Sequence, residues 1–566
     1  MTKRSWLLML LMLVFLSAAV VGCSGGEDDE PNNSEDSGET DDSGDTTDDS
    51  DSGDDESDSS SDDGNSDEAA AGGNTLVYAR GGDSTSLDPI TTTEGEAFRV
   101  TENIFEGLVT YAVDSTEVVP SLAKDWKVSD DGLTYTFELE EGVTFHDGTD
   151  FTADDVVYNF ERWMNGDAEK YPYYTMFGGF KGDENHVIKE VTAEDDYTVK
   201  FTLNHPQATF IKNLAMSPFG MASPEALEEK GEDFMSSPVG TGPFKFEEWK
   251  REEQIVLVKN ENYWQDGLPK LDKVIYTVIP DNSARLNALK TGDVHVVDGV
   301  NPSEVSSIEE DPNLKVLERP SMNVGYMGFT FGRDNPLQDV KVRRALSHAV
   351  PKEQLIDAFY YGQAQPAKTY MPPSVAGYND EIEDYEYDPE KAKQLLAEAG
   401  YENGFEFDLM YMPVARPYIP EGQKIAEVLQ SSFAEIGVTA NIDTIDWGTY
   451  LEEASSGQYD AFLLGWTGDN GDADNFLHTL LGIGSGSNYT GYENEEMNDL
   501  LLEAQRITDE EQRIELYKQA QEILHEEAPW IPLVHSTPVV AVSANVSGYT
   551  PHPTGSEAVT HVELSK

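Results

Sequence analysis

The stretch Gly465-Trp-Thr-Gly-Asp-Asn-Gly-Asp-Ala-Asp-Asn-Phe476 decides how the second half of this chain is interpreted. The apolar run 459–464 precedes it and predicts a buried strand of an α/β sheet. Open α/β sheets bind ligands beyond the carboxyl ends of their strands, so we expect Trp466 and Asp469 in a crevice there. Gly465 allows the backbone to come close to a ligand. The stretch therefore predicts a site for a positively charged group.

Three other interpretations of this stretch stay open. Its content of Asp, Asn and Gly is also typical of a surface turn. Asp472 and Asp474 alternate as the ligands of a calcium loop do, although the glycine and the distal glutamate of such loops are missing at the required spacing. The same acids are compatible with a carboxylate pair for hydrolysis, but no second catalytic element lies nearby in the sequence.

The residues before this stretch predict a strand–helix–strand unit. Residues 405–412 and 438–445 have the composition of strands, and apolar residues recur between them with helical spacing up to Gly437. Such a unit implies parallel strands joined by a right-handed crossover. Arg416 therefore follows the carboxyl end of a strand, as Asp469 does. An arginine and an aspartate that face one crevice match the two charged ends of a peptide.

Other segments also predict an α/β protein. Residues 133–139 alternate apolar and polar side chains, as a half-buried strand does. Thr152 and Asp388 are each placed to cap a helix. The pair His146-Asp147 is interpreted as a turn rather than a metal site, because no second histidine lies nearby at ligand spacing.

Length and charge limit the class of protein. A chain of 566 residues exceeds the usual size of one core, so at least two lobes are expected. The formal net charge is −71, and without residues 1–73 there remain 35 basic and 87 acidic residues, a charge of −52. This excess of acids argues against nucleic acid as a partner. It is typical of a protein exposed to saline or alkaline surroundings, where salt screens the repulsion.

The N-terminus predicts export and a membrane anchor. Lys3 and Arg4 precede the apolar run 6–21, which is short for a spanning helix and typical of a signal peptide. Cys23 is the only cysteine, which excludes a disulfide within the chain and favours lipid attachment at this residue. A leftover residue of a discarded signal peptide is the alternative. Residues 24–73 are rich in Ser, Asp and Gly, hold 21 acids and no Lys or Arg, and predict an extended tether.

Several segments resemble one family in order and spacing. They are Pro120-Ser-Leu-Ala-Lys-Asp-Trp126, Gly240-Thr-Gly-Pro-Phe-Lys245, Asn262-Tyr-Trp264, Asn323-Val-Gly-Tyr326, Asp339-Val-Lys-Val-Arg-Arg-Ala345 and Tyr387-Asp-Pro-Glu-Lys-Ala-Lys393. The chain from Asn74 onward resembles the solute-binding proteins of peptide-transporting ABC importers, family 5, and Val20-Val-Gly-Cys23 resembles the lipobox of bacterial lipoproteins. The segments Met412-Pro-Val-Ala-Arg-Pro-Tyr418 and 465–476 are most similar to the dipeptide-binding members.

The resemblance implies an α/β fold with two lobes, of the type II, cluster C periplasmic-binding-protein class, and an extra subdomain inserted in lobe one. The expected parts are a signal peptide with lipobox at 1–23, an acidic tether at 24–73, lobe one at 74–321, lobe two at 322–537 and a return to lobe one at 538–566. Ligand is expected in the cleft, which closes by a hinge motion. Its backbone is expected to pair with a strand edge near residues 464–466.

The resemblance also implies roles for individual residues. Asp469 would bind the α-amino group of the ligand and Arg416 its carboxylate, while Tyr418 and Trp466 would line the pocket beside Gly465. Thr93 occupies a matching position in the first lobe. The chain departs from the family pattern in three ways: it lacks disulfide cysteines, it has Ala473 where a proline is expected, and its loop 482–486 is short.

The expected protein is a lipid-anchored monomer on the outer face of the cell membrane that delivers dipeptides to the permease subunits of an ABC importer. No cofactor, metal or catalytic residue is expected. The alternatives are a related binder of a nickel chelate, haem or another small solute, and an extracellular hydrolase that uses Asp469, Asp472 or Asp474 with a histidine.

Overall fold

The structure is a computed structural model that describes residues 74–565. The predictions for the signal peptide, Cys23 and the tether fall outside these residues. None of the helices within 74–565 combines the length and the apolar character needed to cross a bilayer.

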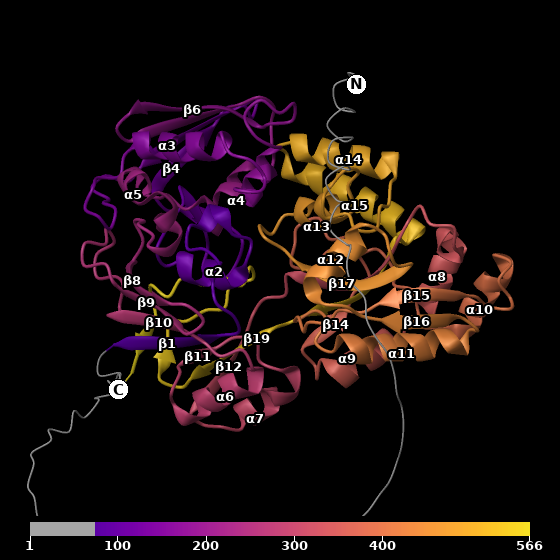
Figure 1. The fold of residues 1–566 in the computed structure, drawn as a ribbon. Helices are drawn as coiled ribbons and strands as arrows, with labels where there is room; N and C mark the ends of the chain where they lie inside the picture. Colours follow the sequence, from indigo (N-terminus) through magenta and orange to yellow (C-terminus); the bar gives the residue numbers. More distant parts are fainter. Residues whose placement is uncertain (1–73, 566) are drawn as a thin grey trace, which may run out of the picture. The chain divides into compact units, whose positions relative to one another are not determined.

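The first lobe is built on a seven-stranded sheet with the order β12-β19-β11-β1-β10-β9-β8 (Figure 1). Its strands are β1 (Thr75–Arg80), β8 (Phe244–Lys250), β9 (Gln254–Lys259), β10 (Lys273–Val278), β11 (Val296–Val297), β12 (Leu314–Glu318) and β19 (Val539–Ser543). The central strand β1 pairs in parallel with β10 and β11, and the remaining pairs are antiparallel. We call the part built on this sheet lobe one.

A four-stranded antiparallel sheet is inserted into lobe one between β1 and β8. It has the order β4-β5-β7-β6, with strands β4 (Ala123–Val128), β5 (Thr134–Leu139), β6 (Ile188–Asp195) and β7 (Thr198–Leu203). Side chains of β5 alternate between half-buried and buried, as predicted. Helix α3 (Ala153–Met164) packs on this sheet and begins with the predicted cap, in which Thr152 and the carboxylate of Asp155 bind each other's backbone N–H groups.

The second lobe is built on a six-stranded sheet with the order β14-β18-β13-β17-β15-β16, and we call this part lobe two. Its strands are β13 (Asn323–Phe329), β14 (Ala364–Pro366), β15 (Glu406–Met410), β16 (Thr439–Asp443), β17 (Ala461–Thr467) and β18 (Trp530–Ser536). The predicted strand–helix–strand unit is confirmed: β15 and β16 are parallel and are joined by α11 (Gly422–Glu435). Helix α11 ends before Gly437, whose φ of 84° favours glycine.

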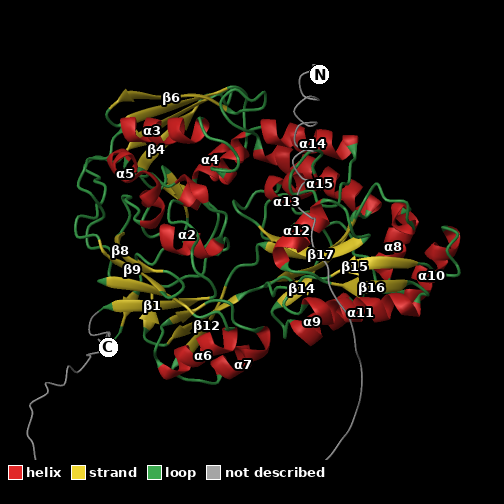
Figure 2. Ribbon diagram, in the orientation of Figure 1, coloured by secondary structure: helices red, strands yellow, loops and turns green. Residues whose placement is uncertain are grey.

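Helices cover the sheets of both lobes (Figure 2). In lobe one they are α2 (Gly95–Thr101), α4 (Phe210–Leu214), α5 (Pro224–Lys230), α6 (Asn282–Thr291) and α7 (Val305–Glu309). In lobe two they are α8 (Val340–His348), α9 (Lys352–Phe359), α10 (Pro389–Glu398), α12 (Trp447–Ser455), α13 (Asp474–Leu481), α14 (Glu495–Arg506) and α15 (Glu510–Glu527). Helices α9 and α11 lie along one face of the six-stranded sheet. The predicted cap of α10 is confirmed, because Asp388 accepts the backbone N–H groups of residues 390 and 391.

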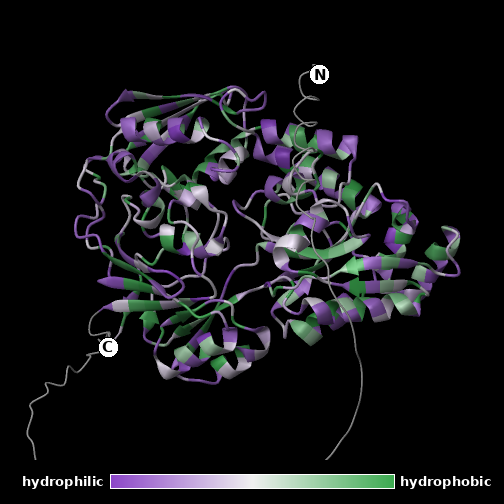
Figure 3. Ribbon diagram, in the orientation of Figure 1, coloured by the Kyte–Doolittle hydropathy of each residue, from purple (hydrophilic) through white to green (hydrophobic). Residues whose placement is uncertain are grey.

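Each lobe has its own apolar core. The core of lobe two draws its buried side chains from residues 322–534, and the strands of both large sheets are mainly hydrophobic (Figure 3). The chain passes from lobe one to lobe two between β12 and β13 and returns between β18 and β19. Two short connections therefore join the lobes, as a hinge requires.

Candidate ligand-binding site

The sheet of lobe two places the two predicted charged residues at one edge. Strands β15 and β17 are parallel, so their carboxyl ends meet at the same side of the sheet. Arg416 follows β15 and Asp469 follows β17. One detail differs from the prediction: β17 continues to Thr467, because β13 pairs with it along its whole length, so Trp466 lies within the strand.

Asp469 is held by uncharged donors only. The hydroxyl of Tyr173, from lobe one, donates to its Oδ1 at 3.1 Å, and the Nδ2 of Asn475 donates to its Oδ2 at 3.0 Å. No Lys or Arg among residues 74–565 forms an ion pair with this carboxylate. Burial raises the pKa of Asp469, since the two hydrogen bonds offset only part of the lost hydration.

Asn475 fixes the conformation of the loop. Its Oδ1 accepts the backbone N–H of Asp469 at 2.8 Å and the Nε1–H of Trp466 at 3.0 Å, while its Nδ2 holds the carboxylate. One amide thus orients both the acid and the aromatic ring. Nothing in the sequence pattern singled out this asparagine, although it belongs to the stretch that decides the fold.

Asp472 has the opposite environment. Arg513 binds both of its oxygens, at 2.7 and 3.1 Å, and Lys212 of lobe one approaches Oδ2 at 3.2 Å. These cations hold the pKa of Asp472 far below its usual range in spite of burial. Because its oxygens are already bound by two cations, the calcium-loop interpretation fails at this residue. Within the described residues no group of three or more His, Cys, Asp and Glu side chains is arranged to hold a metal ion.

Arg416 forms no hydrogen bond or ion pair with Asp469. Its side chain is exposed, its guanidinium lies 5.6 Å from the ring centre of Trp447, and its Nη1 donates to the carbonyl of Ala415 at 3.3 Å. Tyr418 is buried against Gly465, where a Cβ atom would come within 2.2 Å of the tyrosine ring. A glycine is therefore required at position 465 by close packing.

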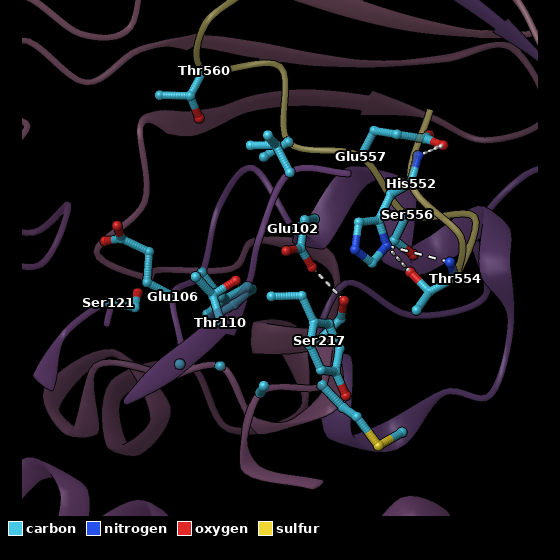
Figure 4. Close-up of a pocket in the computed structure, with 18 of the residues that line it drawn as sticks. Glu102, Glu106, Thr110, Ser121, Ser217, His552, Thr554, Ser556, Glu557 and Thr560 are labelled. Carbon is cyan, nitrogen blue, oxygen red and sulfur yellow. Dashed lines mark hydrogen bonds between the residues drawn. The ribbon is translucent and has the colours of Figure 1, made fainter. Parts of the chain in front are cut away.

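A cavity of about 450 Å³ opens beside Asp469. Of the described residues that line this cavity, Asp469 is the one contributed by lobe two. The other lining residues belong to lobe one and include Tyr111 and Tyr173. Glu102 also lines the cavity from lobe one (Figure 4). The structure does not bring Arg416, Trp466, Tyr418, Gly465 or Thr93 to this cavity. Thr93 is exposed in the turn before α2.

The predicted turn at His146-Asp147 is confirmed. The side chain of His146 is half-buried, with Nε2 2.9 Å from the carbonyl oxygen of Gly242 and Nδ1 3.4 Å from the backbone nitrogen of Gly240. Burial lowers the pKa of His146 to about 4. Its two ring nitrogens serve the packing of the Gly240-Thr-Gly-Pro segment.

Comparison with known proteins identifies the class. The model of the bacterial extracellular solute-binding proteins, family 5 (middle part), matches residues 117–488. The chain is 39% identical over 503 residues to a dipeptide-binding protein of Escherichia coli, covering 85% of this chain and 93% of that protein. It is 40% identical over 492 residues to heme-binding protein A of Haemophilus influenzae, covering 83% and 89%. Among solved structures, a periplasmic binding protein of Helicobacter pylori in complex with peptide STSA matches with a TM-score of 0.75 at 35% identity, covering 87% and 98%.

Proposed function

Because the chain belongs to family 5 of the bacterial extracellular solute-binding proteins, we propose that it captures dipeptides outside the cytoplasm and delivers them, as a monomer, to an ABC importer. Members of this family are binding proteins of transport and not enzymes, so the hydrolase alternative is dropped. We propose the lobe limits 74–321, 322–537 and 538–566 given above.

The observation that carries the proposal is the carboxylate of Asp469. It is half-buried between the lobes, borders a cavity, and has two neutral donors but no cation among the described residues. A carboxylate that loses much of its hydration and has no counterion is unfavourable, so a ligand that supplies an ammonium group is expected to bind there. The α-amino group of a peptide has this charge, and Arg416 at the same sheet edge is proposed to hold the α-carboxylate.

The edge of β17 offers a place for the peptide backbone. Strand β15 pairs with only Ala461 and Phe462, so the later residues of β17 have a strand partner on the β13 side alone. An extended ligand that adds to this edge would gain backbone hydrogen bonds independent of its side chains. Tyr418, Gly465 and Trp466 lie along this part of the strand, and Thr93 is proposed to contact the ligand from lobe one.

The experiment compares free and capped dipeptides by isothermal titration. We expect N-acetylated and C-amidated dipeptides to bind at least a hundredfold more weakly than the free dipeptide, because both charge pairs are proposed to be enclosed when the cleft closes on the ligand, where an unpaired charge costs on the order of 3–5 kcal/mol. Arg416→Ala is expected to weaken the binding of the free dipeptide to a similar extent. The same substitution should hardly change the affinity for Ala-Ala amide, which has no carboxylate for Arg416 to hold. Equal affinity for capped and free dipeptides would place the ligand elsewhere.

Haem is the second candidate ligand, because one relative at 40% identity is named as a heme-binding protein. The same titration should therefore include haem, a nickel–histidine chelate, and peptides of two to five residues. Tight binding of haem with no binding of dipeptides would replace the first proposal by this one.

We also propose that Cys23 carries a lipid anchor and that residues 24–73 hold the protein body away from the membrane. Two or three acyl chains anchor a protein stably, whereas a single chain does not. Cys23→Ala is expected to release the protein or leave it unprocessed. Mass spectrometry of the membrane-bound protein that finds an unmodified Cys23 would contradict this.

The acidic surface is proposed to suit saline surroundings. Repulsion within a body of charge −52 weakens as salt increases from tens of millimolar toward molar concentration. Thermal unfolding of a protein that starts near Asn74 should shift to higher temperature over this range. A midpoint that salt leaves unchanged or lowers would contradict this proposal.

A further inference from the structure

The cavity beside Asp469 is acidic. Its wall in lobe one contains Glu102, Glu106 and Glu557, and no Lys or Arg among residues 74–565 lines it. Figure 4 shows Glu102 between the segment that holds Ser217 and the segment that holds His552 and Glu557. A cavity with four carboxylates and no cation favours a positively charged occupant.

Glu102 is the acid of this wall whose charge is least satisfied. It comes directly after α2, and its Oε2 accepts the hydroxyl of Ser217. None of the described residues forms an ion pair with it. Two arginines of lobe one, Arg99 and Arg319, already have acidic partners. Arg99 pairs with Asp298 and Glu96, and Arg319 pairs with Glu557 at 2.7 Å.

Glu557, a second acid of this wall, has one carboxylate oxygen without a hydrogen-bond partner among the described residues. Its residue surface is 5% exposed, and its Oε2 has no hydrogen-bond partner although its Oε1 binds Arg319 and the backbone N–H of His552. Buried oxygens without partners are rare, since each costs about 1–3 kcal/mol.

Glu106 differs from these two acids. Tyr263 donates to it at 2.8 Å, Thr241 at 2.8 Å and Trp264 at 3.1 Å, so its oxygens are fully bound within the protein. It connects the Gly240-Thr-Gly-Pro and Asn262-Tyr-Trp segments and therefore has a structural role. It still adds negative charge beside Glu102.

The pKa values of Glu102 and Glu106 are both raised. Burial and then the charge of Glu557 raise the pKa of Glu102 to about 7, against the hydrogen bond from Ser217. Burial also raises the pKa of Glu106 to about 7, and Glu102 contributes to this rise. Both carboxylates would gain a favourable interaction from a cation in the cavity.

We propose that this cavity is a specificity pocket for a basic side chain on the first residue of the peptide, with Glu102 as its counterion. The inference rests on the proposed function, which places the α-ammonium group on Asp469 at the cavity wall. The side chain nearest that ammonium group is the one on the first residue. A volume of about 450 Å³ lies in the range of pockets that enclose such groups.

Tyr111 links the two acids in space. It lines the cavity, and its pKa is raised by burial and then by the charges of Asp469 and Glu102. Both carboxylates are therefore near the same phenol. A lysine or arginine whose α-ammonium group binds Asp469 would extend its side chain past Tyr111 toward Glu102.

The test uses lysine and its uncharged isostere norleucine in calorimetric titrations of the full protein. We expect Lys-Ala to bind wild type at least tenfold more tightly than norleucyl-Ala, a difference of about 1.4 kcal/mol. Glu102→Gln should reduce this preference to about threefold or less while norleucyl-Ala binds as in wild type. Glu190→Gln, which removes an exposed acid of β6, is the matched control and should keep the preference.

The wild-type comparison alone can overturn the proposal, whether or not the Glu102 variant folds. Equal affinities for Lys-Ala and norleucyl-Ala would refute the pocket and leave the dipeptide function intact. A preference shown by Ala-Lys and not by Lys-Ala would refute its assignment to the first residue. Failure of every free dipeptide to bind would refute the proposed function itself.

Discussion

Asp469 and Asp472 lie three residues apart in the loop between β17 and α13, yet their surroundings are opposite. Asp472 is bound by Arg513 and Lys212, whereas Asp469 has only the hydroxyl of Tyr173 and the amide of Asn475. The pKa of Asp472 is lowered by its cations, and the pKa of Asp469 is raised by burial. Burial alone therefore does not mark a binding residue. A buried acid whose charge the protein leaves unpaired is the better candidate.

The largest expected effect is on stability, from Asp472→Asn. The substitution leaves Arg513 buried without its counterion, and breaking a buried pair on one side costs about 3–5 kcal/mol. Urea unfolding followed by tryptophan fluorescence should show this loss of free energy of unfolding. Asp499→Asn, at an exposed position of α14, is the control and should change stability by less than about 0.5 kcal/mol.

Asp469→Asn should reduce dipeptide binding and leave the free energy of unfolding intact, whereas Asp472→Asn should reduce the free energy of unfolding. We expect at least hundredfold weaker dipeptide binding, about 2.7 kcal/mol, because the α-ammonium group loses its carboxylate. The free energy of unfolding should stay the same or rise, because a half-buried charge without a counterion is removed. A variant that unfolds easily and still binds dipeptide like wild type would reverse the roles assigned to the two aspartates.

The sequence predicted the parts of this site that depend on local pattern. The strand–helix–strand unit 405–445 was predictable because apolar spacing and Gly437 determine where α11 lies and ends. Its parallel strands then place Arg416 and Asp469 at one edge. Tyr173 was not predictable, because it meets Asp469 from 296 positions away in the chain and no local pattern reports such a contact.

The charge balance of each acid was equally hidden. The acids at 469, 472 and 474 look alike in the sequence, and their difference arises from Lys212 and Arg513, which belong to different lobes. Glu102 follows a short helix and has no motif around it. Its role depends on a cavity whose walls come from segments far apart in the chain.

Glu102 of lobe one resembles Asp469 in lacking a counterion among residues 74–565, and it should make the free energy of unfolding depend on pH. Its folded pKa of about 7 exceeds the ordinary value of 4.5, so the folded protein binds more protons than the unfolded chain between these values, and stability falls as pH rises through this window. Glu102→Gln should therefore stabilise the free protein by about 3 kcal/mol at pH 8 and by well under about 1 kcal/mol at pH 4.5. Thermal unfolding at both pH values checks this. A constant difference between the two proteins at pH 4.5 and 8 would show that this carboxylate does not titrate in that window.

The smallest expected effect concerns the contact between the lobes that Asp472 makes with Lys212. Lys212 approaches Asp472 Oδ2 at 3.2 Å and the carbonyl of Gly471 at 3.3 Å, and beside it the Nδ2 of Asn470 donates to Asn213 Oδ1 at 2.8 Å. The lysine side chain is 28% exposed, so its ion pair is worth about 1 kcal/mol or less.

Lys212→Met should weaken dipeptide binding a few-fold, since the lobes lose a contact that joins them beside the proposed ligand, and it should leave stability almost unchanged because Arg513 still neutralises Asp472. Lys189→Met, at an exposed position of β6, is the control. Calorimetric titration at low and high salt sharpens the result. The affinity difference between wild type and Lys212→Met should shrink as salt screens the pair. A difference that persists unchanged at high salt would mean that the lysine acts through packing and not through its charge.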